Sequence, residues 1–558
     1  MKKFVVLSLV ALLVLALGTM AFAQAKKEEP KLDFKASGFI DIISNYMVNV
    51  PQAGNSTSAA GATGPVNAFF GPPVSYMMPT AGGLTDKAFD KKMSYMETRG
   101  RLKFDAIMGK EMMGTFFFEI DSNRWGDRVE QAGAPVGVGT AAQRNRAGFW
   151  GVADRAAIEV KNMFLTFGVP LVPVPITVQG GIIPMAIRPA VFLATDGPGI
   201  QAAIKVDPAM IRLIWMKAVE NKDWAADDAD LYAIEASAKI STMTVGGYVL
   251  NFNMNTYPAS DGVTPLLTAP AIPPQTASAF PAGSIAWEPN FASNVWWYGI
   301  YATGKLGPVN LNADLVINNG KITDRRDLNP QAKDVKLTGW GGLLNVSYPW
   351  EKFNFGFATI YGSGADLNKT SASGLPGSSV ATSGTGLSGS GTSSKVGAFI
   401  VPAGTEGSVG HSIILCGNGI INRNNTGYEQ AASSAHAAAT FGGMWINKLF
   451  GSFQVTPDYK VTLEAMYIRD TTKSGNTIGT AVKNERVALT SVRDDKDIGW
   501  EFDLFNEIAL YKNLKLAFGG GILFAGDAMD YRVAAPVGFT NVSPKNPWII
   551  ATSLTYSF

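Results

Sequence analysis

Cysteine is almost absent from the sequence. Cys416 is the single cysteine among 558 residues, so no disulfide can form within the chain. Exported proteins that bury little apolar surface commonly depend on disulfides for stability. An exported protein of this length must therefore be stabilised by other interactions.

Charge is also scarce. Asp, Glu, Lys and Arg make up 16% of the residues, against about 25% in ordinary soluble domains, while 46% are hydrophobic and 60 are glycine. Without Lys2 and Lys3, the 45 remaining basic residues balance the 45 acidic ones. A chain without net charge is a poor partner for nucleic acid. The composition is typical of a protein with one side in water and the other in an apolar medium.

Motifs for catalysis or cofactor binding are few. The glycine pattern Gly384–Gly389 matches a dinucleotide fingerprint, but it lies in a Ser/Gly-rich segment with no strand before it and no helix after it. The two histidines, His411 and His436, lie near Cys416 and Ser412 in the longest predicted loop. They leave a Ser/His hydrolase open as an alternative, but we expect no catalytic residue, no metal site and no cofactor.

Long hydrophobic runs occur only near the N-terminus. Lys2 and Lys3 precede an apolar stretch that ends in Ala21-Phe22-Ala23, which predicts a signal peptide over residues 1–23, cleaved after Ala23. An uncleaved anchor is the alternative. Residues 24–31 would then form a periplasmic N-terminal segment.

A second uncharged run, between Lys161 and Arg188, resembles a transmembrane helix only at first sight. It contains four prolines, Pro170, Pro173, Pro175 and Pro184, which would break a helix. Two strands joined by a turn fit it better.

Alternation with a period of two is the main structural signal. Between Ser94 and Met108, the charged residues Glu97, Arg99, Arg101, Lys103 and Asp105 occupy every second position. A helix would scatter them around its axis, whereas a strand places them on one face.

Similar patterns predict strands along the whole mature chain. The expected ranges are 32–48, 94–108, 112–121, 155–167, 175–183, 199–206, 210–219, 230–240, 244–255, 294–304, 309–318, 334–348, 352–363, 437–455, 460–470, 498–510, 514–526 and 548–558.

Connections of two kinds separate these strands. Short turns such as those at 109–111 and 456–459 alternate with longer segments, the longest running from about 364 to 436. A soluble sandwich has no reason to sort its connections by length, whereas a transmembrane barrel has short periplasmic turns and long extracellular loops. We therefore predict an all-β protein, a transmembrane antiparallel up-and-down β-barrel over residues 32–558.

The strand number bears on whether the barrel is hollow. The pattern predicts about 18 strands, or 16 if the hairpin 175–183/199–206 is omitted. Either number leaves room for an aqueous channel, and an even number puts both termini on the periplasmic side.

The chain resembles the Gram-negative outer-membrane porins. The resemblance rests on the export signal, the alternating connections and the C-terminal NPWIIATSLTYSF, with Leu554, Tyr556 and Phe558 at alternate positions. It implies location in the outer membrane, contact with lipid and lipopolysaccharide, and recognition of these three residues by the barrel assembly machinery. It leaves a homotrimer open.

The charged faces of such a barrel must meet water. One Lys or Arg turned to lipid at the bilayer midplane costs about 2 to 4 kcal/mol, and Arg99, Arg101 and Lys103 together roughly 5 to 10 kcal/mol. The residues expected to line the pore are Glu97, Arg99, Arg101, Lys103, Asp105, Glu119, Asp121, Asn310, Asn312, Asp314, Glu464, Glu501, Asp503 and Glu507. They either produce a transverse field that orients solutes or only keep the wall hydrated.

Two loop features remain open. The segment 364–436 contains the apolar patches GAFIVPAG and SIILCGNGII, which either fold into the mouth and narrow it or cover a subunit contact. An acidic cluster near residues 220–230 either binds divalent cations that bridge to lipopolysaccharide or is a solvated loop.

The predicted function is passive diffusion of small hydrophilic solutes and ions through a porin. Besides the hydrolase, a barrel that serves as a sleeve for a periplasmic partner, such as an electron carrier, is an alternative.

Overall fold

Strands account for nearly all regular structure in the described part of the chain. The computed structural model describes residues 31–49, 92–125, 146–147, 158–220, 228–257, 291–324, 335–366, 370–371, 390–402, 412–415, 441–479, 481–486, 493–534 and 537–558. One short 3-10 helix, η6 (Asp527–Met529), lies among these residues. None of the helices described there has the length and apolar character needed to cross a membrane.

Eighteen of the described strands form the wall of the molecule. They are β1 (Leu32–Val48), β2 (Lys92–Met108), β3 (Met112–Trp125), β5 (Glu159–Gly168), β6 (Ile176–Ile187), β7 (Leu193–Val206), β8 (Ala209–Val219), β9 (Ala229–Ile240), β10 (Met243–Tyr257), β11 (Phe291–Leu306), β12 (Val309–Asp324), β13 (Val335–Trp350), β14 (Phe353–Gly362), β17 (Met444–Thr456), β18 (Tyr459–Asp470), β19 (Asp497–Tyr511), β20 (Leu514–Ala525) and β23 (Trp548–Ser557).

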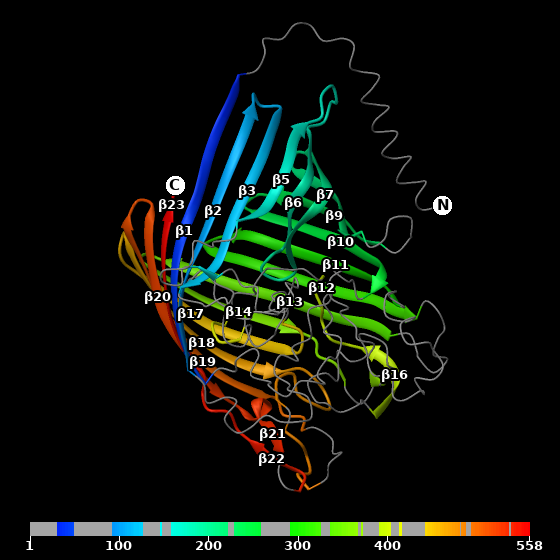
Figure 1. The fold of residues 1–558 in the computed structure, drawn as a ribbon, viewed down its shortest axis with the longest axis vertical. Helices are drawn as coiled ribbons and strands as arrows, with labels where there is room; N and C mark the ends of the chain where they lie inside the picture. The colour runs from blue at the N-terminus through cyan, green and yellow to red at the C-terminus, as the bar shows by residue number, and fades with distance from the viewer. Residues whose placement is uncertain are drawn as a thin grey trace.

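The wall closes on itself. Each of these strands pairs antiparallel with its neighbours in the order given, and β23 pairs with both β20 and β1. The register of the closing pair runs from Phe39 opposite Ser557 to Val48 opposite Trp548. Figure 1 shows the red β23 beside the blue β1. The predicted antiparallel β-barrel of 18 strands is therefore confirmed.

One predicted connection is much shorter than expected. The sequence predicted strands 175–183 and 199–206, but β6 and β7 extend toward each other until Ile187 pairs with Leu193. Pro184 and Pro198 lie within these strands instead of ending them, since a proline removes only one donor from the ladder. Only residues 188–192 connect the two strands.

Several small strands were not predicted. β4 (Arg146–Ala147) and β16 (Ser390–Val396) add to the barrel through parallel pairing with β3 and β13, and β15 (Thr370–Ser371) pairs with β16. β21 (Tyr531–Ala534) and β22 (Phe539–Val542) form a separate hairpin. β4, β15, β21 and β22 have only two to four residues, too few for alternation to be recognised. β16 has seven residues, but no apolar side chain precedes Val396 in it, so it shows no alternation.

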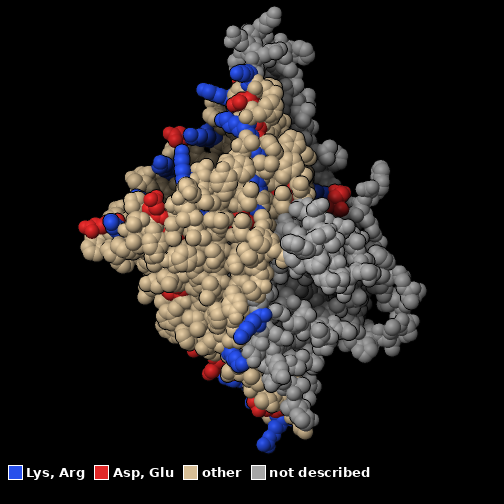
Figure 2. Space-filling model, turned by 60° about the vertical axis from the view of Figure 1, so that its left-hand side comes forward, with Lys and Arg blue, Asp and Glu red and all other residues tan. Residues whose placement is uncertain are grey.

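The outer surface of the barrel is apolar. Along β2, the side chains of Met96 and Phe104 are exposed, whereas the side chain of Glu97, which points to the other face of the strand, is buried. In Figure 2 the charged side chains gather toward the ends of the described surface and leave a band between them that is mostly uncharged. This is the surface that a bilayer requires of a transmembrane barrel.

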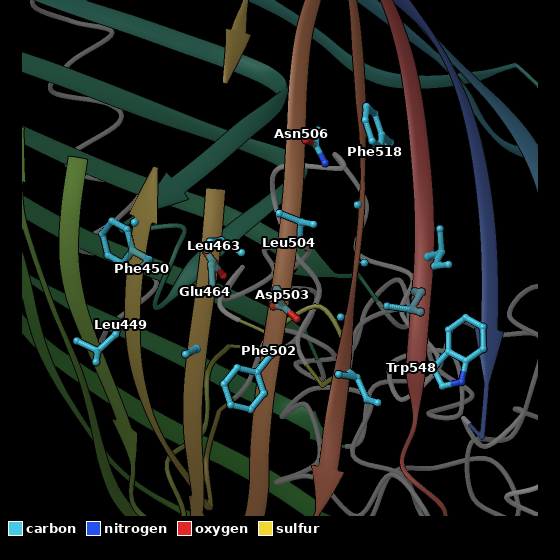
Figure 3. Close-up of a pocket in the computed structure, with 18 of the residues that line it drawn as sticks. Leu449, Phe450, Leu463, Glu464, Phe502, Asp503, Leu504, Asn506, Phe518 and Trp548 are labelled. Carbon is cyan, nitrogen blue, oxygen red and sulfur yellow. The ribbon is translucent and has the colours of Figure 1, made fainter. Parts of the chain in front are cut away.

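The outer wall contains a hollow of about 1180 Å³ over β14, β17, β18, β19, β20 and β23. Its exposed side chains come from alternate positions of these strands and include Leu449, Leu463, Phe502, Leu504 and Phe518 (Figure 3). The lining also includes the buried polar residues Glu464, Asp503 and Asn506 of β18 and β19, although its exposed side chains are apolar.

Aromatic side chains lie near both ends of the wall. Tyr348, Trp350, Tyr511 and Phe558 are exposed at the end with short turns. At the other end, Trp340 stacks on Tyr361 with 4.4 Å between ring centroids. Belts of this kind are typical of the two membrane interfaces.

Candidate functional site

The charged face of β2 points into the barrel. Glu97, Arg99, Arg101, Lys103 and Asp105 alternate with the exposed side chains of Met96, Phe104 and Met108. Since successive side chains of a strand point to opposite faces, the five charges lie on the inner face.

Three cationic side chains, from β2 and β5, surround one carboxylate on the inner face of the wall. Arg99 and Arg101 donate hydrogen bonds from Nε to Oε1 of Glu119 over 2.9 and 2.8 Å. Nζ of Lys161, from β5, lies 3.2 Å from Oε2 of the same residue. Two of these residues were predicted together with Glu119, but Lys161 was not.

Further pairs continue this polar wall. Lys161 also contacts Asp196 of β7 at 2.6 Å, and Lys103 contacts Asp105 at 2.9 Å. Thr115 donates a hydrogen bond of 2.7 Å to Asp105. Asp121 lies in β3, but its side chain is outside the described residues.

A second polar group covers β17, β18 and β19. Lys448 donates to Glu464 over 3.0 Å, and Glu464 stands opposite Asp503 in the strand register. Asp503 is 2% exposed and Glu501, two positions before it, is fully buried. The sequence predicted these three acids but not Lys448.

Glu501 holds a loop segment against the wall. Its Oε2 accepts a hydrogen bond of 2.7 Å from the Ser412 hydroxyl, and its Oε1 accepts one of 3.2 Å from the Ile414 amide. The Leu415 amide donates to the Ser412 hydroxyl over 2.8 Å. The described part of the second apolar patch, residues 412–415, therefore lies against the inner wall.

The described residues of the other apolar patch, GAFIVPAG, also pack inside the barrel. Ala398, Phe399, Ile400 and Val401 are each at most 1% exposed. The Ile400 carbonyl accepts a 2.8 Å hydrogen bond from the indole of Trp297 on β11. Of the two alternatives for segment 364–436, the described parts thus follow the first, in which the loop folds into the barrel.

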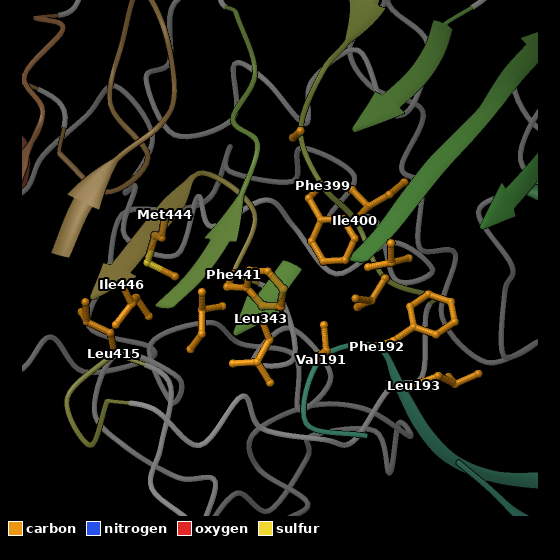
Figure 4. Close-up of a cluster of buried hydrophobic side chains, with 14 of the residues drawn as sticks. Val191, Phe192, Leu193, Leu343, Phe399, Ile400, Leu415, Phe441, Met444 and Ile446 are labelled. Atoms are coloured by element: carbon orange, nitrogen blue, oxygen red, sulfur yellow. The ribbon is translucent and has the colours of Figure 1, made fainter. Parts of the chain in front are cut away.

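These segments join an apolar cluster inside the barrel. Phe399 packs on Phe441 with 5.0 Å between ring centroids. Figure 4 shows these residues with Leu343, Met444 and Ile446 on one side and Val191, Phe192 and Leu193 on the other. Sequence reasoning missed this cluster, because it assumed that inner positions are polar throughout.

Asn310, Asn312 and Asp314 extend the inner face along β12. Asn310 donates to the Ser347 hydroxyl over 3.2 Å. Asp314 accepts two hydrogen bonds from Arg188, of 2.5 and 2.6 Å, and Asn312 accepts a third. Although burial acts to lower it, the bonds and charge of Asp314 raise the pKa of Arg188 above its ordinary value.

Glu507 lies nearer the end of β19 that leads into the short turn. It pairs with Lys460 of β18 and Lys515 of β20. The predicted inner residues therefore fall into three groups, one around Glu119, one on β12 and one on β17 to β19.

The C-terminal residues take part in barrel closure. Gly38 and Phe558 exchange two backbone hydrogen bonds, of 2.9 and 3.0 Å. The rings of Tyr556 and Phe558 lie 5.9 Å apart, and Leu554 pairs with both Ile42 and Leu516.

His411 and His436, one of which a Ser/His hydrolase would need, lie outside the described residues, as does Cys416, whereas Ser412 is described. Within the ranges that are described, no group of three or more His, Cys, Asp and Glu side chains has an arrangement suited to a metal ion. Lys217 contacts Glu220, Asp228 and Asp230 of the acidic cluster; Asp223 and Asp227 are not described.

No protein-family model matches the sequence, and no curated protein matches it. Solved structures with a similar chain course include OpdQ of Pseudomonas aeruginosa, with a TM-score of 0.44 and 8% identity over 94% of this chain and 98% of that one. OpdK of Pseudomonas aeruginosa with vanillate has a TM-score of 0.43 and 8% identity over the same shares of the two chains. OccAB2 of Acinetobacter baumannii has a TM-score of 0.43 and 10% identity, again over 94% of this chain and 98% of that one.

Proposed function

We propose that the protein is an outer-membrane porin through which small hydrophilic solutes and ions diffuse down their gradients. The observation that carries this proposal is a closed cylinder of 18 strands with an apolar outer face and a charged inner face. Barrels of 16 to 18 strands are wide enough to hold an aqueous channel.

The distribution of charge supports this orientation of the wall. Ion pairs such as Lys448 with Glu464 lie on the inner face, while Leu449 and Leu463, their neighbours in sequence, are exposed on the outer face. Reversing the faces would place several charges in hydrocarbon at about 2 to 4 kcal/mol for each cation near the midplane.

The proposal includes the fourteen inner residues predicted from the sequence as the lining of the channel. It also includes the groups around them, Lys161, Arg188 and Lys448. The lining contains charges of both signs, and several of them pair with an opposite charge on a neighbouring strand. Solutes would meet a hydrated wall of fixed dipoles.

Export and assembly form a further part of the proposal. Residues 1–23 would be removed as a signal peptide, and Leu554, Tyr556 and Phe558 would be recognised by the barrel assembly machinery. The apolar outer band would contact lipid and lipopolysaccharide, with a homotrimer as one arrangement in the membrane. Mass spectrometry of the mature N-terminus and native mass spectrometry of the assembled protein test these points.

Flux measurements test the function itself. The purified protein, reconstituted into liposomes, should cause swelling in iso-osmotic small sugars at a rate that falls as the sugar grows larger. In planar bilayers it should give discrete ohmic steps. Heat-unfolded protein in the same detergent is the control. Absence of both swelling and current above this control would refute the proposal.

A further inference from the structure

Three carboxyl groups and a single ammonium group meet on the inner face of β17, β18 and β19. Glu501 and Asp503 lie two positions apart on β19 and so point to the same face. Glu464 stands opposite Asp503 in the strand register, and Figure 3 shows these two side chains on neighbouring strands. The ammonium group is that of Lys448, and all four side chains are buried. One cation cannot neutralise three carboxylates, and a buried charge without compensation is costly.

Asp503 differs from the other members of this group in its partners. Lys448 pairs with Glu464, and Glu501 accepts hydrogen bonds from the loop segment 412–415. Both carboxyl oxygens of Asp503 are buried, and no donor among the described residues reaches them. The side chain that does contact Asp503 is the carboxyl group of Glu501.

The surroundings of Asp503 are closely packed. Gly521 of β20 stands opposite it in the register, and a Cβ at Gly521 would overlap Oδ1 of Asp503 and lie 2.7 Å from Cγ2 of Ile413. Asp503 therefore lies over a glycine and beneath the loop segment. The charged groups that act on it are Glu501 on its own strand, Glu464 on β18 and Lys448 on β17.

The contact between the two carboxyl groups requires a proton. Ionised carboxylates only accept hydrogen bonds, so one of the two must be the acid. Glu501 already accepts bonds at both of its oxygens, from Ser412 and from the Ile414 amide. Asp503 is then the donor, and like-charged pairs of this kind commonly share one proton.

We propose that Asp503 is a protonated acid that positions the loop segment 412–415 by donating a hydrogen bond to Glu501, and that loss of this proton to water releases the segment. Deprotonation leaves three anions beside Lys448 and sets Asp503 and Glu501 against each other. The segment is therefore held when the pH is low and released as the pH rises. This inference goes beyond the proposed channel function and does not depend on it.

Infrared spectroscopy of the reconstituted protein tests for the proton. At neutral pH the wild type should show the C=O stretching band of a protonated carboxylic acid, which Asp503→Asn should lack and which should vanish as the pH rises. Glu464→Gln removes a neighbouring negative charge, so the band should vanish about one to two pH units lower. Asp458→Asn, which changes an aspartate in an exposed turn, should keep the band.

Labelling of Cys416 with a maleimide tests the position of the segment, since this cysteine follows Leu415. Asparagine has the shape of the protonated acid and donates a hydrogen bond at every pH. Because a thiol reacts faster as it ionises, each rate is divided by that of the unfolded chain at the same pH. The wild-type ratio should rise severalfold from neutral to alkaline pH, while the Asp503→Asn ratio should stay constant.

Each result bears on a separate part of the inference. A wild type without the infrared band, or a band that persists in Asp503→Asn, would overturn the protonated state of Asp503. Labelling ratios with the same pH dependence in the wild type and in Asp503→Asn would overturn its positioning role. A protein that conducts no ions would overturn the porin function and leave both of these results valid.

Discussion

Glu119 shows how much of the inner wall depends on single residues. Arg99, Arg101 and Lys161 all converge on its carboxylate, so one anion organises three strands. Alternation in the sequence identified the first two cations, since both lie on one strand. Lys161 directly precedes the uncharged run that ends at Arg188, and only the pairing of β3 with β5 brings it to Glu119.

Loss of the two arginines should change selectivity. In Arg99→Ala with Arg101→Ala, Glu119 keeps only Lys161 as a cationic partner, so the wall around it becomes more negative and the permeability ratio should move severalfold toward cations. Reversal potentials in salt gradients measure this shift. If the ratio stays at the wild-type value, the charges only hydrate the wall and produce no field across it.

Ser412 should control the position of its loop segment. Ser412→Ala removes one hydrogen bond to Glu501 and one from the Leu415 amide, at a cost of about 1 to 3 kcal/mol. Cys416 follows Leu415 in sequence and is the single cysteine of the chain, so its rate of maleimide labelling reports on the segment. We expect faster labelling than in the wild type.

The control for this measurement is Ser474→Ala, which changes a serine in another connection. Labelling that is equally fast in the wild type and in Ser412→Ala would mean that the hydrogen bonds to Glu501 do not position the segment.

At the scale of elements, the strands were predictable and the inward folding was not. Alternating side chains located all 18 wall strands, because lipid on one side and polar groups on the other impose a period of two. An apolar patch such as Ala398–Val401 has no such period. Its place depends on distant contacts, among them the hydrogen bond between Trp297 and Ile400, which no local pattern encodes.

A glycine in β13 makes room for that patch. A Cβ at Gly339 would lie 2.2 Å from the Ala398 carbonyl oxygen, so Gly339→Ala should displace the segment and its contact with Trp297. We expect altered tryptophan fluorescence and a loss of about 1 to 3 kcal/mol of stability. Gly114→Ala, where a Cβ meets nothing within 4 Å, is the control. Identical spectra and stability in both variants would contradict this packing.

The last strand should govern closure of the barrel. Deletion of Phe558 removes the two backbone hydrogen bonds to Gly38 and the aromatic ring at the end of β23. The fraction of chains that reach the folded, heat-modifiable form in the outer membrane should fall. Gel mobility of unheated membrane extracts measures this fraction, with a Lys512→Gln variant as control. An undiminished folded fraction would remove Phe558 from any role in assembly.

At the scale of the whole molecule, the account depends on the two faces of one closed sheet. The outer face offers lipid an apolar band, and the inner face holds ion pairs and the inward-folded segments. The sequence could not reveal how far those segments fill the interior, because inner positions that face water and inner positions that face a folded loop have the same spacing.

The most direct test is to measure which medium each residue of β2 meets in a bilayer. Single cysteines at positions 101 to 104, in a Cys416→Ser background, would carry spin labels in reconstituted liposomes. We predict that labels at Arg101 and Lys103 collide with a water-soluble nickel reagent, whereas labels at Leu102 and Phe104 collide with oxygen dissolved in lipid. Accessibilities that do not alternate, or that alternate in the opposite sense, would contradict a barrel with lipid outside and water within.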